Sequence, residues 1–190
     1  IISNTTCILY IGLTHHAENR FGGGNNSEAG LKEDGKKLLQ YLNGRKIAVD
    51  FSHASDALAH EMLDYISEHQ LEIPILASHS NYREVFDHVR NLPDDLAKEI
   101  IERGGLIGVN FLRAFVNNDN PNALYQHINH GLKLGGANSI CFGADYYGTG
   151  GHPDRSRVPF YFKEHENATC YPSILNEIEK QVSPDVVEGI

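Results

Sequence analysis

Apolar residues gather in short runs along the chain, and each run is followed by a stretch in which apolar positions recur every three or four residues. The runs lie at residues 6–13, 46–51, 73–77, 106–111 and 139–143. The periodic stretches lie at 27–43, 55–70, 93–103, 122–134 and 172–181. Short apolar runs bounded by turn residues are typical of buried strands, and the longer period is typical of helices. The pattern therefore predicts five strands that alternate with helices in an α/β fold with a parallel sheet.

Local signals mark where several of these elements begin or end. Ser55 is predicted to cap the helix that follows it, whose apolar face would be formed by Ala57, Leu58, Met62, Leu63 and Ile66. Gly44 is predicted to end the helix before it. The glycines at 22–24 lack the lysine and serine of a phosphate-binding loop, which favours a close-packed turn. Residues 146–169, rich in glycine, proline and charge, predict an ordered loop or lid.

The strand count favours part of a (β/α)8 TIM barrel. A complete barrel typically takes about 250 residues. Five βα units in 190 residues suggest its larger, carboxyl-terminal part, with residues 1–190 belonging to one barrel domain. A five-stranded doubly wound sheet is the alternative, but its glycine fingerprints are absent after the first strand.

Composition narrows the classes of partner. The net charge of −9 argues against nucleic acid, and no apolar stretch approaches the roughly 20 residues of a membrane span. Cys7 and Cys141 lie in strand-like runs, which predicts buried free thiols and favours the cytoplasm over an oxidising compartment. The chain opens with Ile1, and its one methionine is Met62. We therefore expect it to be a piece of a longer protein whose signal peptide, if any, cannot be judged.

Two histidines follow neighbouring predicted strands in similar surroundings, His53 in VDFSHAS (49–55) and His79 in SHS (78–80). Side chains just past the carboxyl ends of parallel strands lie where α/β proteins place their chemistry. Because neighbouring strands lie about 5 Å apart, both imidazoles could reach one metal ion. The alternative is a pair of polar strand-end residues bonded to the backbone.

Six motifs in a fixed order carry a resemblance to a known family. They are LTH (13–15), VDFSHAS (49–55), SHS (78–80), RNLPDD (90–95), GVNF (108–111) and FGAD (142–145). In this order they resemble the membrane (renal) dipeptidases, the M19 metallopeptidases of the amidohydrolase superfamily, over residues 8–187. The resemblance implies a (β/α)8 barrel that hydrolyses dipeptides with two zinc ions bridged by a carboxylate and a hydroxide.

The same resemblance implies roles for five residues. His53 and His79 resemble zinc ligands, and His15 resembles the residue that polarises the scissile carbonyl. Arg90 resembles the arginine that holds the substrate carboxylate, and Asp145 resembles the aspartate that faces the nucleophilic water and the substrate amine. From the residues alone, Arg90 could instead be a surface arginine near a helix start, and Asp145 an ordinary turn residue.

The chain also departs from the family pattern. Tyr147 stands where the family has a second acidic residue, which puts the shape of the substrate pocket in doubt. The family's His-x-Asp pair and bridging glutamate would precede Ile1, and His127 and His130, on a predicted helix, do not replace them. His152, in the predicted lid, is a further candidate for reaching the site.

Other functions and partners stay open at this stage. The rival interpretation is a non-catalytic or single-metal member that binds a small carboxylate ligand, or a hydrolase of N-acyl amino acids. The expected partners are a dipeptide and the rest of the chain's own barrel, with a homodimer left open. With two of the expected ligands and two apolar strand edges, at 8–11 and 140–142, residues 1–190 alone are expected to be inactive and prone to associate.

Overall fold

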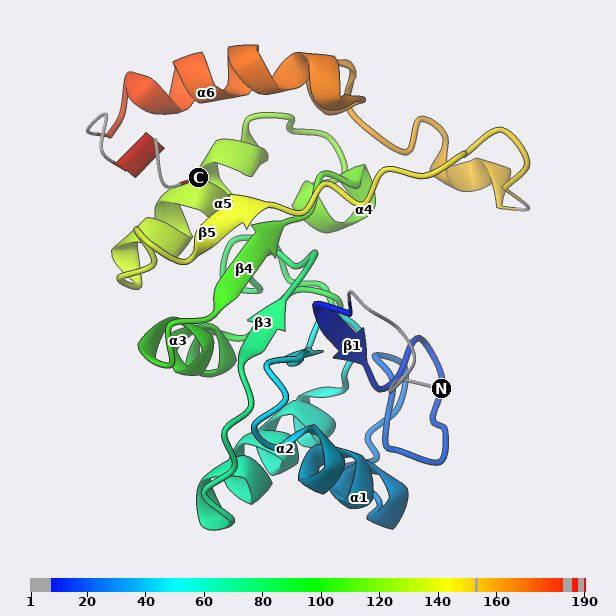
Figure 1. Ribbon diagram of the computed structural model, residues 1–190. Helices are drawn as coiled ribbons and strands as arrows, with labels where there is room; N and C mark the ends of the chain where they lie inside the picture. Colours follow the sequence, from blue (N-terminus) through cyan, green and yellow to red (C-terminus); the bar gives the residue numbers. More distant parts are fainter. Residues whose placement is uncertain (1–7, 153, 183–185, 188–189) are drawn as a thin grey trace. The chain divides into compact units, whose positions relative to one another are not determined.

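The computed structural model describes residues 8–152, 154–182, 186–187 and 190, and the chain divides into two compact units, Ile1–Ala77 and Ser78–Ile190 (Figure 1). The first unit alternates strands and helices in the order β1 (Tyr10–Gly12), α1 (Glu33–Leu42), β2 (Ala48–Asp50), α2 (Asp56–Glu68) and β3 (Ile75–Ala77). β2 pairs in parallel with β1 on one side and β3 on the other. Leu39, Leu58 and Met62 are fully buried on the apolar faces of α1 and α2. The two helices therefore supply much of this unit's core.

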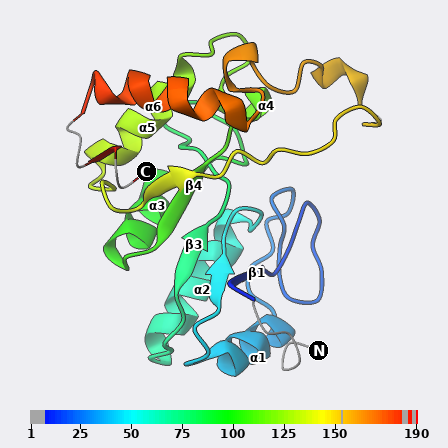
Figure 2. The same ribbon diagram turned by 45° about the horizontal axis from the view of Figure 1, so that its top comes forward.

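The second unit contains two strands and most of the helices. Its elements are α3 (Asp94–Glu102), β4 (Leu106–Val109), α4 (Arg113–Val116), α5 (Ala123–Lys133), β5 (Ile140–Phe142), the short 3-10 helices η2 (Arg155–Arg157), η3 (Lys163–His165) and η4 (Ala168–Cys170), and α6 (Tyr171–Glu179). β4 and β5 are parallel neighbours. Figure 2 shows α5 and α6 side by side, and Ile128, Ile174 and Ile178 from these helices share one buried cluster with Phe111.

Most predicted elements are confirmed, and so is the α/β class. All five strands occur, and each pairing within a unit is parallel between strands that are consecutive in sequence. The Ser55 hydroxyl accepts a 3.0 Å hydrogen bond from Leu58 N and caps α2 as expected. Gly44, just after α1, has a φ of 69°, a left-handed conformation that favours glycine at a helix end.

Several local predictions are wrong, and tertiary contacts explain the clearest case. α1 begins at Glu33, not at residue 27, because the preceding segment is held in an irregular conformation by α2. There Leu31 N donates to Glu61 Oε2 at 2.6 Å, and Ser55 Oγ donates to Ala29 O at 2.7 Å. These two bonds satisfy backbone groups that a longer helix would have to satisfy itself.

Smaller differences concern single residues. The buried face of α2 contains Ala59 rather than Ala57, and the short helix α4 was not predicted. Cys141 is free as expected, but it is half-buried rather than buried, and Cys170 is free as well. Cys7 and the start of the first predicted strand lie outside the described residues. Leu9 and Tyr10 expose 77% and 48% of their surface, in keeping with the expectation of an apolar strand edge at 8–11.

Two glycines on neighbouring strands leave room for a backbone carbonyl. A Cβ atom on Gly108 or on Gly143 would lie 2.1 or 2.0 Å from Ser78 O, closer than any real contact. Ser80 N in turn donates to Gly108 O at 2.7 Å. The absence of side chains at these two positions therefore lets the segment that carries His79 lie directly against β4 and β5.

None of the helices in the described part of the chain is long and apolar enough to cross a bilayer.

A buried histidine joins three parts of the second unit. His127, on α5, is fully buried; its Nδ1 accepts from Tyr82 N at 3.2 Å and its Nε2 lies 3.0 Å from Val116 O. The backbone N–H requires an unprotonated Nδ1 and the carbonyl requires a protonated Nε2, so the neutral ring fits both partners. Burial lowers the pKa of His127 to about 4.

We expect this histidine to make the protein less stable in mild acid. Its pKa lies below the ordinary value of 6.5, so the unfolded chain binds the proton first. The contribution of His127 to the free energy of unfolding should be complete above pH 6.5 and fall by up to about 3 kcal/mol as the pH drops toward 4. Denaturant unfolding of the wild type and of His127→Gln, which keeps one acceptor and one donor, measures the difference at each pH. A difference that does not change between pH 7 and 4 would contradict this assignment.

Candidate active site

In the first unit, two histidines predicted to act at the site lie together. His15 follows β1 and His53 follows β2, two strands that pair in parallel. Their rings stack with centroids 4.1 Å apart and planes 27° apart. Thr14 Oγ1 donates to His53 O at 3.1 Å and ties the two strand ends together. Parallel pairing thus brings these two residues to one edge of the sheet, whereas the sequence pattern paired His53 with His79.

A buried asparagine orients the rings of His53 and His16. Asn25, from the loop after the glycines at 22–24, places its Oδ1 3.2 Å from His53 Nδ1 and 3.3 Å from His16 Nδ1. Because an amide oxygen can only accept, each Nδ1 must carry the hydrogen, and each neutral ring keeps the lone pair on Nε2. This outer hydrogen bond is the kind that orients metal-binding histidines. Neither Asn25 nor His16 was among the residues singled out by the sequence.

The glycine loop is a close-packed turn, as predicted. A Cβ atom on Gly24 would lie 2.3 Å from His15 O, and Asn25 N donates to the same carbonyl at 3.2 Å. This close approach sets Asn25 beside the histidines.

Three imidazoles in this unit could hold a metal ion. One ring nitrogen from each of His15, His16 and His53 lies within 4.8 Å of the others. Imidazole nitrogen is a preferred ligand of zinc and of other first-row transition metals. The donor set therefore suits such an ion, although it differs from the predicted pair of His53 and His79.

In the second unit, one asparagine connects His79 with Asp145. Asn110 follows β4 and is fully buried. Its Nδ2 lies 3.2 Å from Asp145 Oδ2 and 3.4 Å from His79 O, and it donates to both. Its Oδ1 accepts from Leu112 N at 2.7 Å. All the hydrogen-bonding atoms of this side chain are therefore used in fixing the strand ends around it.

A second asparagine completes this arrangement. Asn81 Nδ2 donates to Asn110 O, and Asn110 N donates to Asn81 Oδ1, both at 3.0 Å. We call Asn81 and Asn110 the asparagine pair. His79 itself is half-buried, with its Nδ1 2.6 Å from the Ser78 hydroxyl.

Asp145 has an unusual backbone conformation. Its φ is 59°, which aspartate tolerates better than most residues but which still carries strain. Tyr161 supports it, since its hydroxyl donates to Asp145 O at 2.5 Å. Burial raises the pKa of Tyr161, so this hydroxyl keeps its proton.

Arg90 is buried, unlike the surface arginine that was its alternative. It exposes 5% of its surface, and its guanidinium carbon lies 5.2 Å from the centre of the Phe115 ring. Its backbone N donates to His88 Nδ1 at 3.1 Å. The next residue, Asn91, donates through Nδ2 to Phe86 O and Phe115 O, which fixes this turn against α4.

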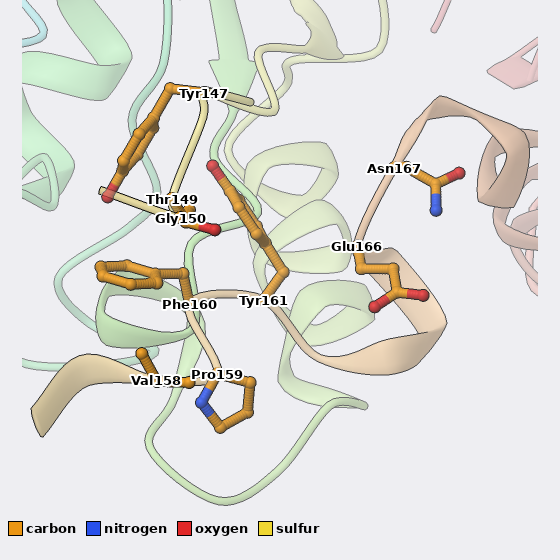
Figure 3. Close-up of a pocket in the computed structure, with 9 residues that line it drawn as sticks. All are labelled: Tyr147, Thr149, Gly150, Val158, Pro159, Phe160, Tyr161, Glu166 and Asn167. Atoms are coloured by element: carbon orange, nitrogen blue, oxygen red, sulfur yellow. The ribbon is translucent and has the colours of Figure 1, made fainter. Parts of the chain in front are cut away.

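The segment predicted as a lid is ordered by aromatic contacts. Its residues line a cavity of about 350 Å³, in which Tyr147, Phe160 and Tyr161 form an aromatic side and Glu166 and Asn167 a polar side (Figure 3). Tyr147, the departure from the family pattern, contacts Tyr161 with ring centres 6.3 Å apart. His152 packs on Phe160 and bonds to the backbone of Asp154. Tyr147, two residues after Asp145, is thus part of a pocket wall.

The sequence from residue 4 to residue 190 matches the family model of the membrane dipeptidases, peptidase family M19. The chain belongs to this family. It is 30% identical over 183 residues to an uncharacterized dipeptidase of Schizosaccharomyces pombe, covering 92% of this chain and 41% of that protein. A second uncharacterized dipeptidase of that yeast is 26% identical over 196 residues, covering 96% of this chain and 44% of that protein. This M19 chain therefore spans less than half the length of these curated relatives.

Solved structures show the same fold. The dipeptidase AC, an M19 metallopeptidase, is 21% identical with a TM-score of 0.79, covering 96% of this chain and 54% of that one. A metallopeptidase from Rhodobacter sphaeroides, liganded with a phosphinate mimic of the dipeptide L-Ala-D-Ala, is 21% identical with a TM-score of 0.77, covering 95% and 51%. The likeness confirms the predicted fold for the M19 chain described here.

We expect Asn110→Asp to destabilise this M19 chain by about 2–4 kcal/mol. The variant has the same shape, but it loses both Nδ2 donors and places a second carboxylate beside Asp145. Denaturant unfolding at pH 7 measures the loss. Asn122→Asp, the same change at an exposed helix start, serves as the control and should stay within about 0.5 kcal/mol of the wild type. Equal stability of the two variants would show that Asn110 does not hold the strand ends.

Proposed function

We propose that the whole protein is a metal-dependent dipeptidase with a binuclear zinc site, to which this chain contributes His53 and His79. Membership of the M19 family supports a metallopeptidase. The observation that carries the proposal is the stacked pair His15 and His53, with Asn25 bonded to Nδ1 of His53, which leaves Nε2 as the nitrogen that could bind a metal. The remaining ligands, a His-x-Asp pair and a bridging glutamate, are expected from sequence that precedes Ile1.

A zinc pair in such a site would lower the pKa of a bound water and polarise the scissile carbonyl. The residues of this chain would do the rest. His15, stacked on His53, would donate a hydrogen bond to the carbonyl oxygen as negative charge develops there. Asp145, whose Oδ2 is held by Asn110, would accept the proton of the attacking water and pass it to the leaving amine.

Arg90 would recognise the carboxyl end of the substrate. Burial and the fixed turn around Asn91 restrict its guanidinium to few positions, which suits a bidentate bond to a carboxylate. A free carboxylate at a fixed distance from the scissile bond favours short substrates. The Rhodobacter sphaeroides relative binds a mimic of L-Ala-D-Ala, which makes this dipeptide a sensible first substrate to assay.

The metal assignment is tested on the full-length protein by measuring zinc affinity in three variants. We expect His53→Ala and His79→Ala to weaken zinc binding by more than the roughly 10- to 100-fold that follows loss of an outer-shell partner. His16→Ala removes a ring nitrogen of the first-unit cluster. Its zinc affinity should fall by no more than about 10- to 100-fold. Strong loss in His16→Ala and none in His79→Ala would instead favour a site made by His15, His16 and His53.

The role of Arg90 is tested by Arg90→Lys, which keeps the charge but loses the planar pair of hydrogen bonds. We expect kcat/KM for L-Ala-D-Ala to fall by about 100-fold with zinc content unchanged. Arg103→Lys, on the exposed end of α3, is the matched control and should retain wild-type activity. The carboxyl-terminal amide of the dipeptide should be a poor substrate for the wild type. If Arg90→Lys prefers the free acid as strongly as the wild type does, another group holds the carboxylate.

A further inference from the structure

A second arginine shares an aromatic ring with Arg90. The guanidinium carbon of Arg157, in η2 of the 146–169 segment, lies 5.8 Å from the centre of the Phe115 ring, and that of Arg90 lies 5.2 Å from the same centre. The two guanidinium groups therefore cannot be further apart than the sum of these distances. Arg157 also lies 5.8 Å from the ring of Phe160, so it is held between two aromatic side chains.

Arg157 lines a small cavity of mixed polar and apolar character. This cavity, of about 150 Å³, is also lined by the polar residues Arg113, Asn118 and Ser156, with Ala114 and Phe160 as its apolar part. Arg113 N donates to Phe160 O at 2.9 Å, and Leu112 pairs with Tyr161, so the backbone joins the start of α4 to the residues that follow η2. Two guanidinium groups and an amide are donors that match a carboxylate.

Positively charged side chains are concentrated around this cavity. The whole chain carries a net charge of −9, so a cluster of arginines does not follow from composition. Burial lowers the pKa of His88, which packs on Phe115, and Arg90, Arg157 and Arg83 lower this pKa further, while Asp87 opposes them. The nearby carboxylate of Asp154 already accepts from Ser156 N and Ser156 Oγ and is exposed.

We infer that Arg157, together with Arg113, binds a side-chain carboxylate of the substrate, so that the preferred dipeptides end in an aspartyl or glutamyl residue. This rests on the proposed function, in which Arg90 holds the main-chain carboxylate of that same residue. The two carboxylates of such a residue are separated by only a few carbon atoms, and two arginines on one ring can address both. Each anion would also relieve the repulsion between neighbouring guanidinium groups.

Tyr147 fits this specificity. Burial raises its pKa, Asp145 raises it further and Arg157 lowers it, so the phenol lies in the field of both charged groups. An acidic residue at position 147, as in the family pattern, would compete for Arg157. A neutral tyrosine leaves the guanidinium to the substrate.

The test uses the full-length, zinc-loaded protein and three dipeptides, L-Ala-Ala, L-Ala-Glu and L-Ala-Gln, each with the second residue in L and D form. We expect kcat/KM for the glutamyl dipeptide to exceed that for the glutaminyl one by about tenfold or more. Arg157→Gln should abolish this preference by lowering kcat/KM for the glutamyl substrate alone. Arg157→Lys should retain part of the preference. Lys163→Gln removes the same charge from the same segment without lining the cavity, and should keep the wild-type preference.

Binding gives a second measurement that needs no turnover. Calorimetry with N-acetylglutamate and N-acetylglutamine should show tighter binding of the acid by about tenfold or more, lost in Arg157→Gln and kept in Lys163→Gln. If the protein hydrolyses L-Ala-Ala but shows the same kcat/KM and the same affinity for acid and amide, this inference is wrong and the dipeptidase proposal stands. No hydrolysis, with Arg157-dependent binding of the acid, would overturn the dipeptidase proposal and the substrate preference that rests on it, and would keep only the assignment of Arg157 as a carboxylate-binding residue. Failure of both measurements would overturn both.

Discussion

The asparagine pair is the constraint on which the arrangement of His79 and Asp145 in the second unit depends. Asn81 and Asn110 exchange backbone and side-chain hydrogen bonds, and the amide group of Asn110 then reaches His79 and Asp145. Both side chains are fully buried or nearly so, where an unsatisfied amide would be costly. The geometry around Asp145 is thus set by groups that cannot move without losing several hydrogen bonds at once.

The sequence predicts the parts of the fold that depend on local pattern. The strand runs, the cap at Ser55 and the glycine after α1 all follow from rules that involve neighbours in sequence. The first turn of α1 does not, because the Glu61 side chain, thirty residues away, takes the backbone N–H of Leu31. The 146–169 segment was expected to be ordered, but the aromatic contacts that order it have no periodicity from which to predict them.

The same distinction between local pattern and distant contacts applies to the residues of the candidate site. His53, His79, Asp145 and Arg90 stand out because their residue types are chemically reactive or charged and their motifs are distinctive. Neither Asn25 nor Asn110, although the latter lies within the GVNF motif, was assigned a role, since an asparagine after a strand or a glycine is common in turns. Their importance comes from burial and from distant partners such as His53 and Asp145, which only the folded chain reveals.

The aromatic packing around Asp145 gives the protein a built-in optical reporter. The chain has nine tyrosines and no tryptophan, so no indole can accept energy from the phenols or mask their emission. Four of the nine, Tyr146, Tyr147, Tyr161 and Tyr171, contact one another in the segment that follows β5. Ultraviolet absorption and fluorescence of the unlabelled protein therefore depend strongly on the surroundings of this segment. Binding of a ligand that rearranges the segment can be followed without any introduced probe.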